Sequence, residues 1–150
     1  MAEPSGPFAK PSAIERAFGS ALGWLLHLGV GPSHMRVLEV RGRKSGRTFT
    51  LPVDLLAKDG KLYLVAPRGR AQWVRNAESA GVVVLRRGSR AQEHRLRALT
   101  DSEKPPILKA YLDSFKSEVQ RFFPLPAGSP VEQFAPLVSR YPAFELLRHG

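Results

Sequence analysis

A basic turn between two apolar segments is the feature that most constrains the fold of this chain. Residues 41–47 contain four cations and two glycines, and residues 35–40 and 48–56 on either side are largely apolar. Apolar segments of this length around a glycine-containing turn predict two antiparallel strands. The glycines let the turn bend, and its crowded cations repel one another unless an anion shares them. The turn alone leaves two interpretations open, an anion site or a solvated basic hairpin tip.

Further strand-like segments follow the same hairpin pattern. Asp59 and Gly60 form an Asp-Gly pair, which is typical of a tight hairpin turn. Units in which strands and helices alternate regularly are not evident, so we predict an antiparallel sheet rather than a doubly wound parallel one. The additional strands are expected at residues 62–66, 82–85, 93–99 and 143–147.

Helical spacing of apolar residues predicts helices around these strands. Ser12 and Glu15 have the form of a capping box at the start of a helix over residues 13–28. A short helix over residues 72–79 is followed by Gly81, where a helix end favours glycine. Residues 131–140 predict a short helix interrupted by Pro136. A long helix that opens after Asp101 carries an apolar stripe made of Ile107, Leu108, Tyr111, Leu112, Phe115, Val119 and Phe122.

The order of these elements predicts an α+β fold, a small antiparallel barrel with flanking helices. A chain of 150 residues is expected to form a single domain over 1–150, with the proline-containing residues 1–11 as a flexible arm. We find neither a secretory leader nor the roughly 20 apolar residues that span a bilayer, so we expect a cytoplasmic protein. Peripheral membrane association through the basic face and the first helix stays open, as does the choice between monomer and homodimer.

The charge of the chain favours a polyanionic partner. It contains 23 Lys and Arg against 13 Asp and Glu, a net charge of +10. Nucleic acid, acidic lipid and a phosphorylated ligand would all suit such a surface. The absence of cysteine excludes disulfides and thiolate metal sites.

Familiar catalytic motifs do not account for this chain. Residues 42–46 lack the spacing of a phosphate-binding loop, and a Gly-x-Ser-x-Gly elbow is missing. The four histidines are scattered without metal-ligand spacing, so we expect no metal site. These histidines are His27, His34, His94 and His149.

Trp73 lies close in sequence to a second group of cations, formed by Arg68, Arg70 and Arg75. In a meander, this group and the basic turn can approach the same end of the sheet. An aromatic ring beside converging cations suits a ligand with a ring system and an anionic tail. The alternative is that Trp73 packs in the core and the arginines are solvated.

Five short motifs occur in an order that resembles the deazaflavin-dependent nitroreductase family. The resemblance covers about residues 37–99 and implies a split β-barrel that uses coenzyme F420. The motifs are Gly-Arg-Lys-Ser-Gly at 42–46, Thr-Leu-Pro at 50–52, Tyr-Leu-Val-Ala at 63–66, Trp-Val-Arg-Asn at 73–76 and Val-Val-Val-Leu at 82–85.

The resemblance also implies roles for individual residues. Arg43, Lys44 and Ser45 would hold the phosphate and acidic tail of the cofactor. Ala66 and Pro67 would line the deazaflavin, and Arg68 would face its anionic portion. Trp73 and Asn76 would shape the pocket wall and brace its loop. Gly46, Arg47 and Pro52 complete the expected cofactor-binding set.

Two departures from the family bear on the substrate side. Phe49 stands where the family often has an arginine, for which Arg47 is the available substitute, and the loop between Ala66 and Trp73 is short.

The implied activity is hydride transfer from reduced F420 to a quinone-like, nitro or other conjugated small-molecule acceptor, with catalytic residues unassigned. An F420-binding carrier or sensor without turnover is the first alternative. A nucleic-acid binder ranks third, because the chain lacks a recognisable motif for that role, and no nucleic-acid partner is expected.

Overall fold

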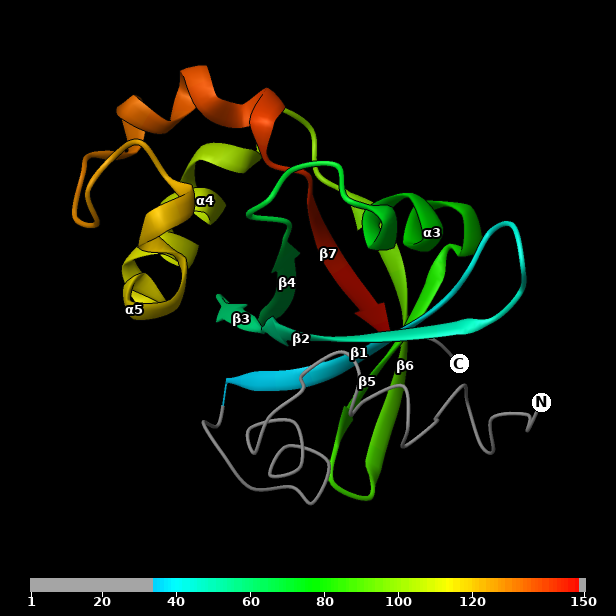
Figure 1. Ribbon diagram of the computed structural model, residues 1–150. Coiled ribbons are helices and arrows are strands. Elements are labelled where there is room, and N and C mark those ends of the chain that lie inside the picture. The colour runs from blue at the N-terminus through cyan, green and yellow to red at the C-terminus, as the bar shows by residue number, and fades with distance from the viewer. Residues whose placement is uncertain (1–33, 149–150) are drawn as a thin grey trace.

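The computed structural model describes residues 34–148, and it confirms the antiparallel α+β barrel (Figure 1). The predicted arm at residues 1–11 and the helix at 13–28 lie outside the described residues. The strands form a seven-stranded sheet in the order β2-β1-β5-β6-β7-β4-β3, with antiparallel neighbours throughout. Their bounds are β1 Met35–Arg41, β2 Thr48–Asp54, β3 Leu56–Lys58, β4 Lys61–Val65, β5 Val82–Arg87, β6 Arg90–Ala98 and β7 Ala143–Arg148.

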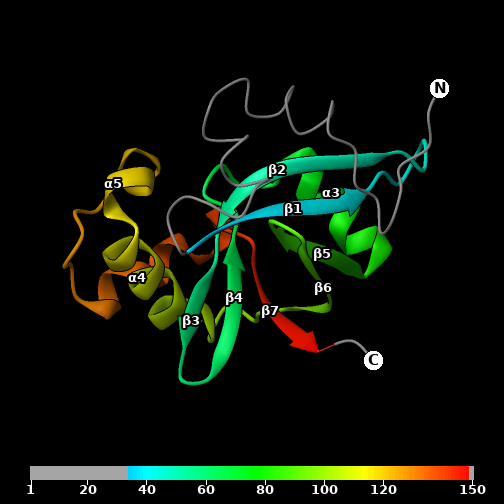
Figure 2. The same cartoon turned by 90° about the horizontal axis from the view of Figure 1, so that it is seen from below.

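The sheet curls so far that its two edge strands are consecutive in the chain (Figures 1 and 2). The apolar segment at residues 48–56 predicted one strand, but the structure divides it at Leu55. β2 pairs with β1, whereas β3 pairs with β4, and the change of partner requires the bend. The Leu55 amide donates to the His34 carbonyl at 2.8 Å, which ties the bend to the start of β1.

The predicted short helix is present as α3, Gln72–Ala80, and packs against β1 and β5. It ends as expected at Gly81, which has the left-handed φ of 74° that favours glycine. Val74, Asn76 and Ala77 form its buried side. The helix therefore presents one polar residue, Asn76, to the barrel.

The predicted long helix is wrong in one respect, because it stops at Ser114. The chain continues through Phe115 into α5 (Lys116–Val119) and the 3₁₀ turn η1 (Gln120–Phe122). Phe115 leaves helical geometry at φ −122° and ψ 32°, and its ring is buried. The apolar stripe thus keeps its core contacts across the break, with Phe122 partly buried at its end.

The last predicted helix is a 3₁₀ helix, η2, Val131–Arg140. Pro136 has no amide hydrogen, which disfavours a regular α-helix there. α4 (Lys104–Ser114), α5, η1 and η2 form a helical lobe, residues 104–140, around one cluster of buried aromatic and aliphatic side chains. In Figure 1 this lobe stands beside β3 and β4, on the other side of β7 from α3.

A charged network joins this lobe to the sheet. Arg97 on β6 donates to Glu145 on β7 at 2.9 Å and to both oxygens of Glu103, just before α4, at 3.1 Å each. The Thr100 amide also donates to Glu103 at 2.8 Å. These hydrogen bonds lower the pKa of Glu103 from 4.5 to about 2, and the one from Arg97 contributes more than the one from the Thr100 amide.

We therefore expect Glu103→Gln to reduce the loss of folding stability that the protein shows as the pH falls below 4.5. A carboxylate whose pKa is lowered on folding stabilises the folded state above pH 4.5, and this contribution disappears as the pH falls toward about 2. Thermal unfolding across this range would measure the effect. The exposed Glu132→Gln should leave the profile unchanged, and parallel profiles for Glu103→Gln and the native chain would contradict the prediction.

Candidate functional site

The basic turn, residues 41–47, is closed by its own backbone. The Gly42 amide donates to the Arg47 carbonyl at 2.7 Å, and the Gly46 amide donates to the Gly42 carbonyl at 3.0 Å. Gly46 has a φ of 73°, which side chains other than glycine rarely adopt. A Cβ on Gly42 would lie 2.6 Å from the Phe49 ring. The two glycines therefore allow a tight turn with an aromatic ring folded against it.

Arg43 fixes this turn to α3. Its backbone amide and its Nη1 both donate to Oδ1 of Asn76, at 3.1 and 2.7 Å, and Nη1 also donates to Gln72 at 2.9 Å. Asn76 is buried, so its oxygen needs these donors. The Arg43 guanidinium is consequently held in place by two neutral amide groups, those of Gln72 and Asn76.

A pocket of about 340 Å³ lies between the basic turn, β2 and α3. Its walls include the rings of Phe49, which is 47% exposed, and Trp73, which packs against Phe144 with ring centroids 6.4 Å apart. The buried Thr50 hydroxyl has no hydrogen-bond partner within the described part of the chain. The pocket is lined by Gly42, Arg43, Lys44, Ser45, Phe49, Thr50, Leu51, Gln72, Trp73 and Asn76.

This turn pocket combines groups that suit a ring with an anionic substituent. Arg43 and Lys44 supply positive charge, and two aromatic rings supply flat apolar surface. Within residues 34–148, Lys44 makes no hydrogen bond or ion pair. Its ammonium group is thus available to an anionic ligand.

Five of the eleven residues expected to bind cofactor line the turn pocket, namely Arg43, Lys44, Ser45, Trp73 and Asn76. Gly46 and Arg47 close the turn beside it, and Pro52 lies farther along β2, opposite Val37. Ala66, Pro67 and Arg68 follow the end of β4. Gly42, Phe49, Thr50, Leu51 and Gln72 also line the pocket. The sequence could have identified four of these five additional residues, since Gly42, Thr50 and Leu51 belong to the family motifs and Gln72 adjoins Trp73.

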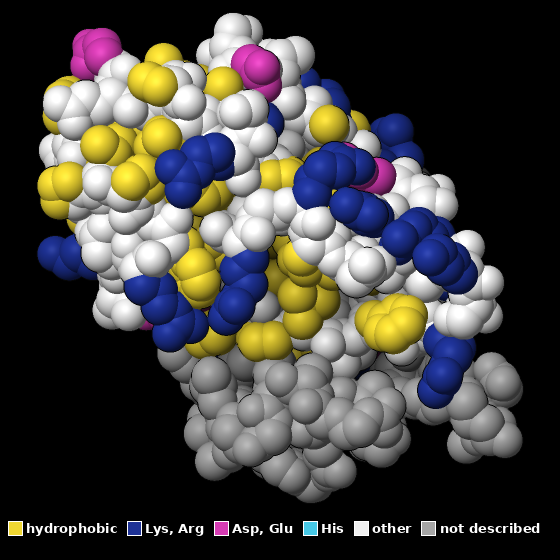
Figure 3. Space-filling model, turned by 45° about the horizontal axis from the view of Figure 1, so that its top comes forward, with side chains coloured by type: hydrophobic (Ala, Val, Ile, Leu, Met, Phe, Trp, Pro, Cys, Tyr) yellow, Lys and Arg dark blue, Asp and Glu magenta, His cyan; other side chains and the backbone are white. Residues whose placement is uncertain are grey.

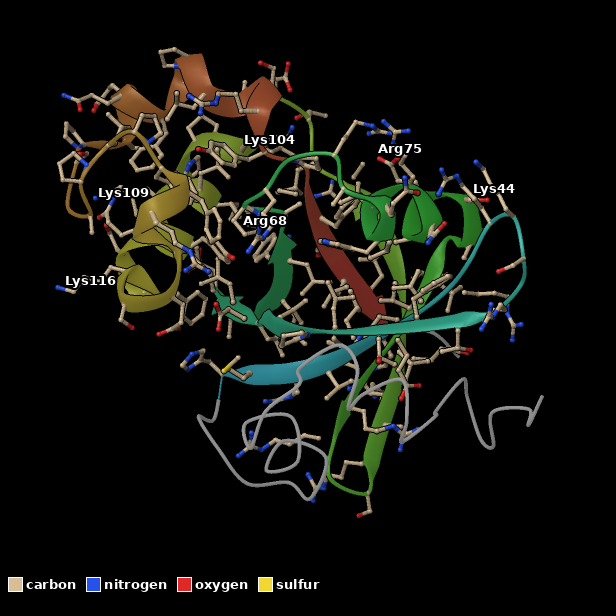
Figure 4. All side chains as sticks on the ribbon, viewed as in Figure 1. Lys44, Arg68, Arg75, Lys104, Lys109 and Lys116 are labelled. Atoms are coloured by element: carbon tan, nitrogen blue, oxygen red, sulfur yellow. The ribbon has the colours of Figure 1, made fainter. Side chains whose placement is uncertain are left out.

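Arg68 occupies a second position on the same side of the barrel. Its guanidinium lies 4.9 Å from the centre of the Phe122 ring in the helical lobe. Figure 4 places Arg68 between β4 and the lobe, and Lys44 at the far tip of the basic turn. Ala66 is buried against Val74 and Phe144. A ligand that reached both cations would have to be elongated.

The other expected cations are placed differently. Arg70 forms a two-point ion pair with Glu78 on α3, at 2.5 and 3.1 Å. Arg75 projects outward from α3 (Figure 4). Figure 3 shows hydrophobic side chains at the centre of this face with Lys and Arg side chains on both sides of them. The face thus offers an apolar surface bordered by positive charge.

The tyrosines Tyr63 and Tyr111, whose hydroxyl groups could in principle donate a proton, are core residues. Tyr111 is 2% exposed and packs edge-on against Phe115 with centroids 5.5 Å apart. Burial is the main cause that raises the pKa of Tyr111, so its hydroxyl stays protonated. Tyr63 is buried as well. Tyr111 therefore has a packing role in the core.

No helix among residues 34–148 has the length and apolar character needed to cross a membrane. This finding covers only the part of the chain that the structure describes.

Comparison with protein families gives one match. Residues 11–120 match the sequence model of a family described as F420H(2)-dependent quinone reductase. That range contains all the residues that line the turn pocket. Comparison with curated proteins gave no match.

Solved structures share the fold at low sequence identity. A structure of an F420-H2 dependent reductase (FDR-A) is 18% identical, with a TM-score of 0.52 over 76% of this chain and 94% of that one. A domain-swapped dimer is 17% identical, with a TM-score of 0.54 over 87% and 90%. An FAD-binding protein from Mesorhizobium loti is 14% identical, with a TM-score of 0.51 over 87% and 88%. At these identities the similarity establishes the fold alone.

Proposed function

The chain belongs to the F420H(2)-dependent quinone reductase family, and from that membership we propose that this F420-dependent oxidoreductase reduces a quinone-like, nitro or other conjugated small molecule. Reduced F420 supplies the hydride when it is bound. The chain itself must bind the anionic part of the cofactor, orient its ring and keep water away from it. The turn pocket is the observation that supports this proposal.

The residues present suit such a cofactor. Arg43 is held by Asn76 and Gln72, so an anion that it binds meets a cation already in position. Lys44 adds a second charge, and the unpaired Thr50 hydroxyl offers a polar contact. Because charge-assisted hydrogen bonds are about twice as strong as neutral ones, these groups favour a phosphate or carboxylate. Arg43, Lys44 and Thr50 therefore form the proposed anion-binding end.

The acceptor belongs at the other end of the same face. The hydrophobic centre in Figure 3 suits an apolar conjugated ring, and Arg68 lies between β4 and the lobe in Figure 4. Ala66 and Pro67 precede Arg68 directly, so their backbone can border the cofactor ring. In this arrangement the chain acts by positioning two rings against each other, which carries much of the rate in such transfers.

Two measurements test this function. Oxidised F420 would be titrated into the protein and followed by fluorescence, and oxidation of reduced F420 would then be followed with a quinone, a nitroaromatic compound and no acceptor. We expect saturable binding and acceptor-dependent oxidation. Binding without turnover on both acceptors would favour a carrier or sensor. Absent F420 binding, combined with salt-sensitive binding of nucleic acid, would contradict the proposal.

Lys44→Ala is expected to weaken F420 binding by roughly tenfold, about 1.4 kcal/mol, because one charge-assisted contact is lost at the anion-binding end. The fluorescence titration measures this change. Lys61→Ala is the matched control, since it removes the same charge from an exposed position at the start of β4. Equal weakening by both variants would mean that the overall charge, rather than the basic turn, attracts the cofactor.

A further inference from the structure

Three ligand-type side chains meet at the end of β2 that lies far from the basic turn. His34 precedes β1, Asp54 ends β2, and Glu118 belongs to α5. His34 Nε2 lies 3.0 Å from Glu118 Oε1 and 3.2 Å from Asp54 Oδ1. One ligand atom from each residue lies within 4.8 Å of the others. We call these three residues the His34 cluster.

The fold holds His34 and Asp54 of the His34 cluster in place. Asp54 stands opposite Met35 in the β1–β2 register, so it is a direct neighbour of the residue after His34. The His34 carbonyl accepts the Leu55 amide at 2.8 Å. The His34 ring stacks on Phe115, with centroids 4.7 Å apart and an angle of 25° between the planes. This stacking fixes the direction of Nε2 toward the two carboxylates.

The donors and acceptors in the His34 cluster do not balance. A single imidazole nitrogen faces two carboxylates, and it is hydrogen-bonded to Glu118. The Asp54 side chain is only 8% exposed, and its buried Oδ1 has no hydrogen-bond partner among the described residues. A buried carboxylate oxygen without a partner is costly. One proton on Nε2 cannot satisfy both carboxylates, whereas a divalent cation can bind all three atoms.

We propose that His34, Asp54 and Glu118 bind one divalent transition-metal ion of the zinc type. One imidazole nitrogen with two carboxylate oxygens is a ligand set for zinc, manganese or iron(II) rather than for magnesium or calcium, which prefer oxygen alone. With metal–ligand bonds of about 2.0–2.2 Å, three such atoms can surround one ion and leave further positions for water. The ion would join the start of β1 and the end of β2 to α5, and so fasten the helical lobe to the barrel.

This proposal differs from the expectation, based on the scattered positions of the histidines in the sequence, that the chain has no metal site. The three ligands are separated by 20 and 64 residues, so no compact motif marks them. They converge because β1 and β2 pair at this end, where Phe115 before α5 and Glu118 within it both contact His34. The proposed site is also separate from the turn pocket, which contains none of these residues.

The test uses the full chain without an affinity tag, dialysed against a chelator and then freed of it. Zn²⁺ is titrated by calorimetry, Co²⁺ is titrated by visible absorption, and thermal unfolding is measured with and without each ion. We expect one ion per chain, Co²⁺ absorption bands typical of nitrogen and oxygen ligands, and a raised unfolding temperature with bound metal.

The variants decide which residues bind the ion. Asp54→Asn and Glu118→Gln should each weaken Zn²⁺ binding by at least roughly tenfold, since even the loss of a residue that only supports a ligand costs 10–100-fold. Glu132→Gln, an exposed glutamate on η2, is the matched control and should bind as the native chain does. Circular dichroism checks that each variant folds, and the more peripheral Glu118→Gln keeps the test decisive if Asp54→Asn does not fold.

Two results would overturn the proposal. One is the absence of saturable binding of Zn²⁺ and Co²⁺ with one ion per chain. The other is unchanged affinity in folded Glu118→Gln, because the measured ion would then sit elsewhere. Both readouts are independent of F420 and of catalytic activity, so they do not depend on the proposed reductase function.

Discussion

Arg86→Leu is expected to lower the free energy of unfolding by about 3–5 kcal/mol, the usual cost of leaving a buried charge without its partner. Glu39 on β1 is completely buried, and Arg86 Nε on β5 donates to its Oε2 at 2.7 Å. The other oxygen of Glu39 has no hydrogen-bond partner in the described residues. Burial is the main cause that raises the pKa of Glu39, and Arg86 opposes this shift. Urea unfolding of the two proteins measures the difference.

Two further variants separate the ion pair from general damage to the sheet. Glu39→Leu combined with Arg86→Leu should regain most of the loss, because replacing a whole buried pair by apolar residues is often close to neutral. Arg95→Leu removes an exposed arginine from β6 and should change stability by less than about 0.5 kcal/mol. A loss for Arg86→Leu no larger than that for Arg95→Leu would refute the buried-charge interpretation.

The loss in Arg86→Leu should also depend on pH. A carboxyl group whose pKa is raised on folding binds its proton more tightly in the folded state, so folding gains stability as the pH falls through that pKa. Without Arg86, burial acts on Glu39 unopposed and raises its pKa further. The difference between Arg86→Leu and the native chain should therefore shrink as the solution is acidified.

Asn76→Ala is expected to cost about 1–3 kcal/mol of stability and to weaken F420 binding. The substitution removes the oxygen that accepts both the Arg43 amide and its guanidinium, at 3.1 and 2.7 Å. The basic turn would then lose its connection to α3, and Arg43 would no longer be held in place. Urea unfolding and the F420 fluorescence titration measure the two effects.

Asn76→Asp distinguishes support of the turn from a general packing role. It keeps the accepting oxygen and should preserve most of the stability, but its negative charge should weaken the binding of an anionic cofactor. Ser79→Ala, at an exposed position on the same helix, is the control for helix effects. Native F420 affinity in Asn76→Ala would contradict the role assigned to Arg43.

Local pattern was sufficient to predict most elements of the fold. The alternation of apolar and polar residues, the turn glycines and Gly81 fixed the strands, the basic turn and α3 close to their observed bounds. The predicted bounds of the long helix and of the second strand were wrong because the apolar pattern continued along the chain at places where the packing or pairing partner changed. The apolar stripe continued through Phe115, yet the helix broke there so that the buried ring could keep its core contacts. Likewise, β2 continued into β3 in sequence but bent at Leu55 to pair with β4.

The sequence by itself determined the family motifs, the positive charge and the order of hairpins, because each depends on neighbouring residues along the chain. Only the tertiary structure decided that Asn76 holds Arg43, that Arg86 reaches Glu39 and that His34 meets Asp54 and Glu118. These contacts join residues far apart in the chain, and they follow from how strongly the sheet curls and where the lobe packs. Sequence spacing carries no signal for such contacts, since the distance between two side chains depends on the whole path of the chain between them.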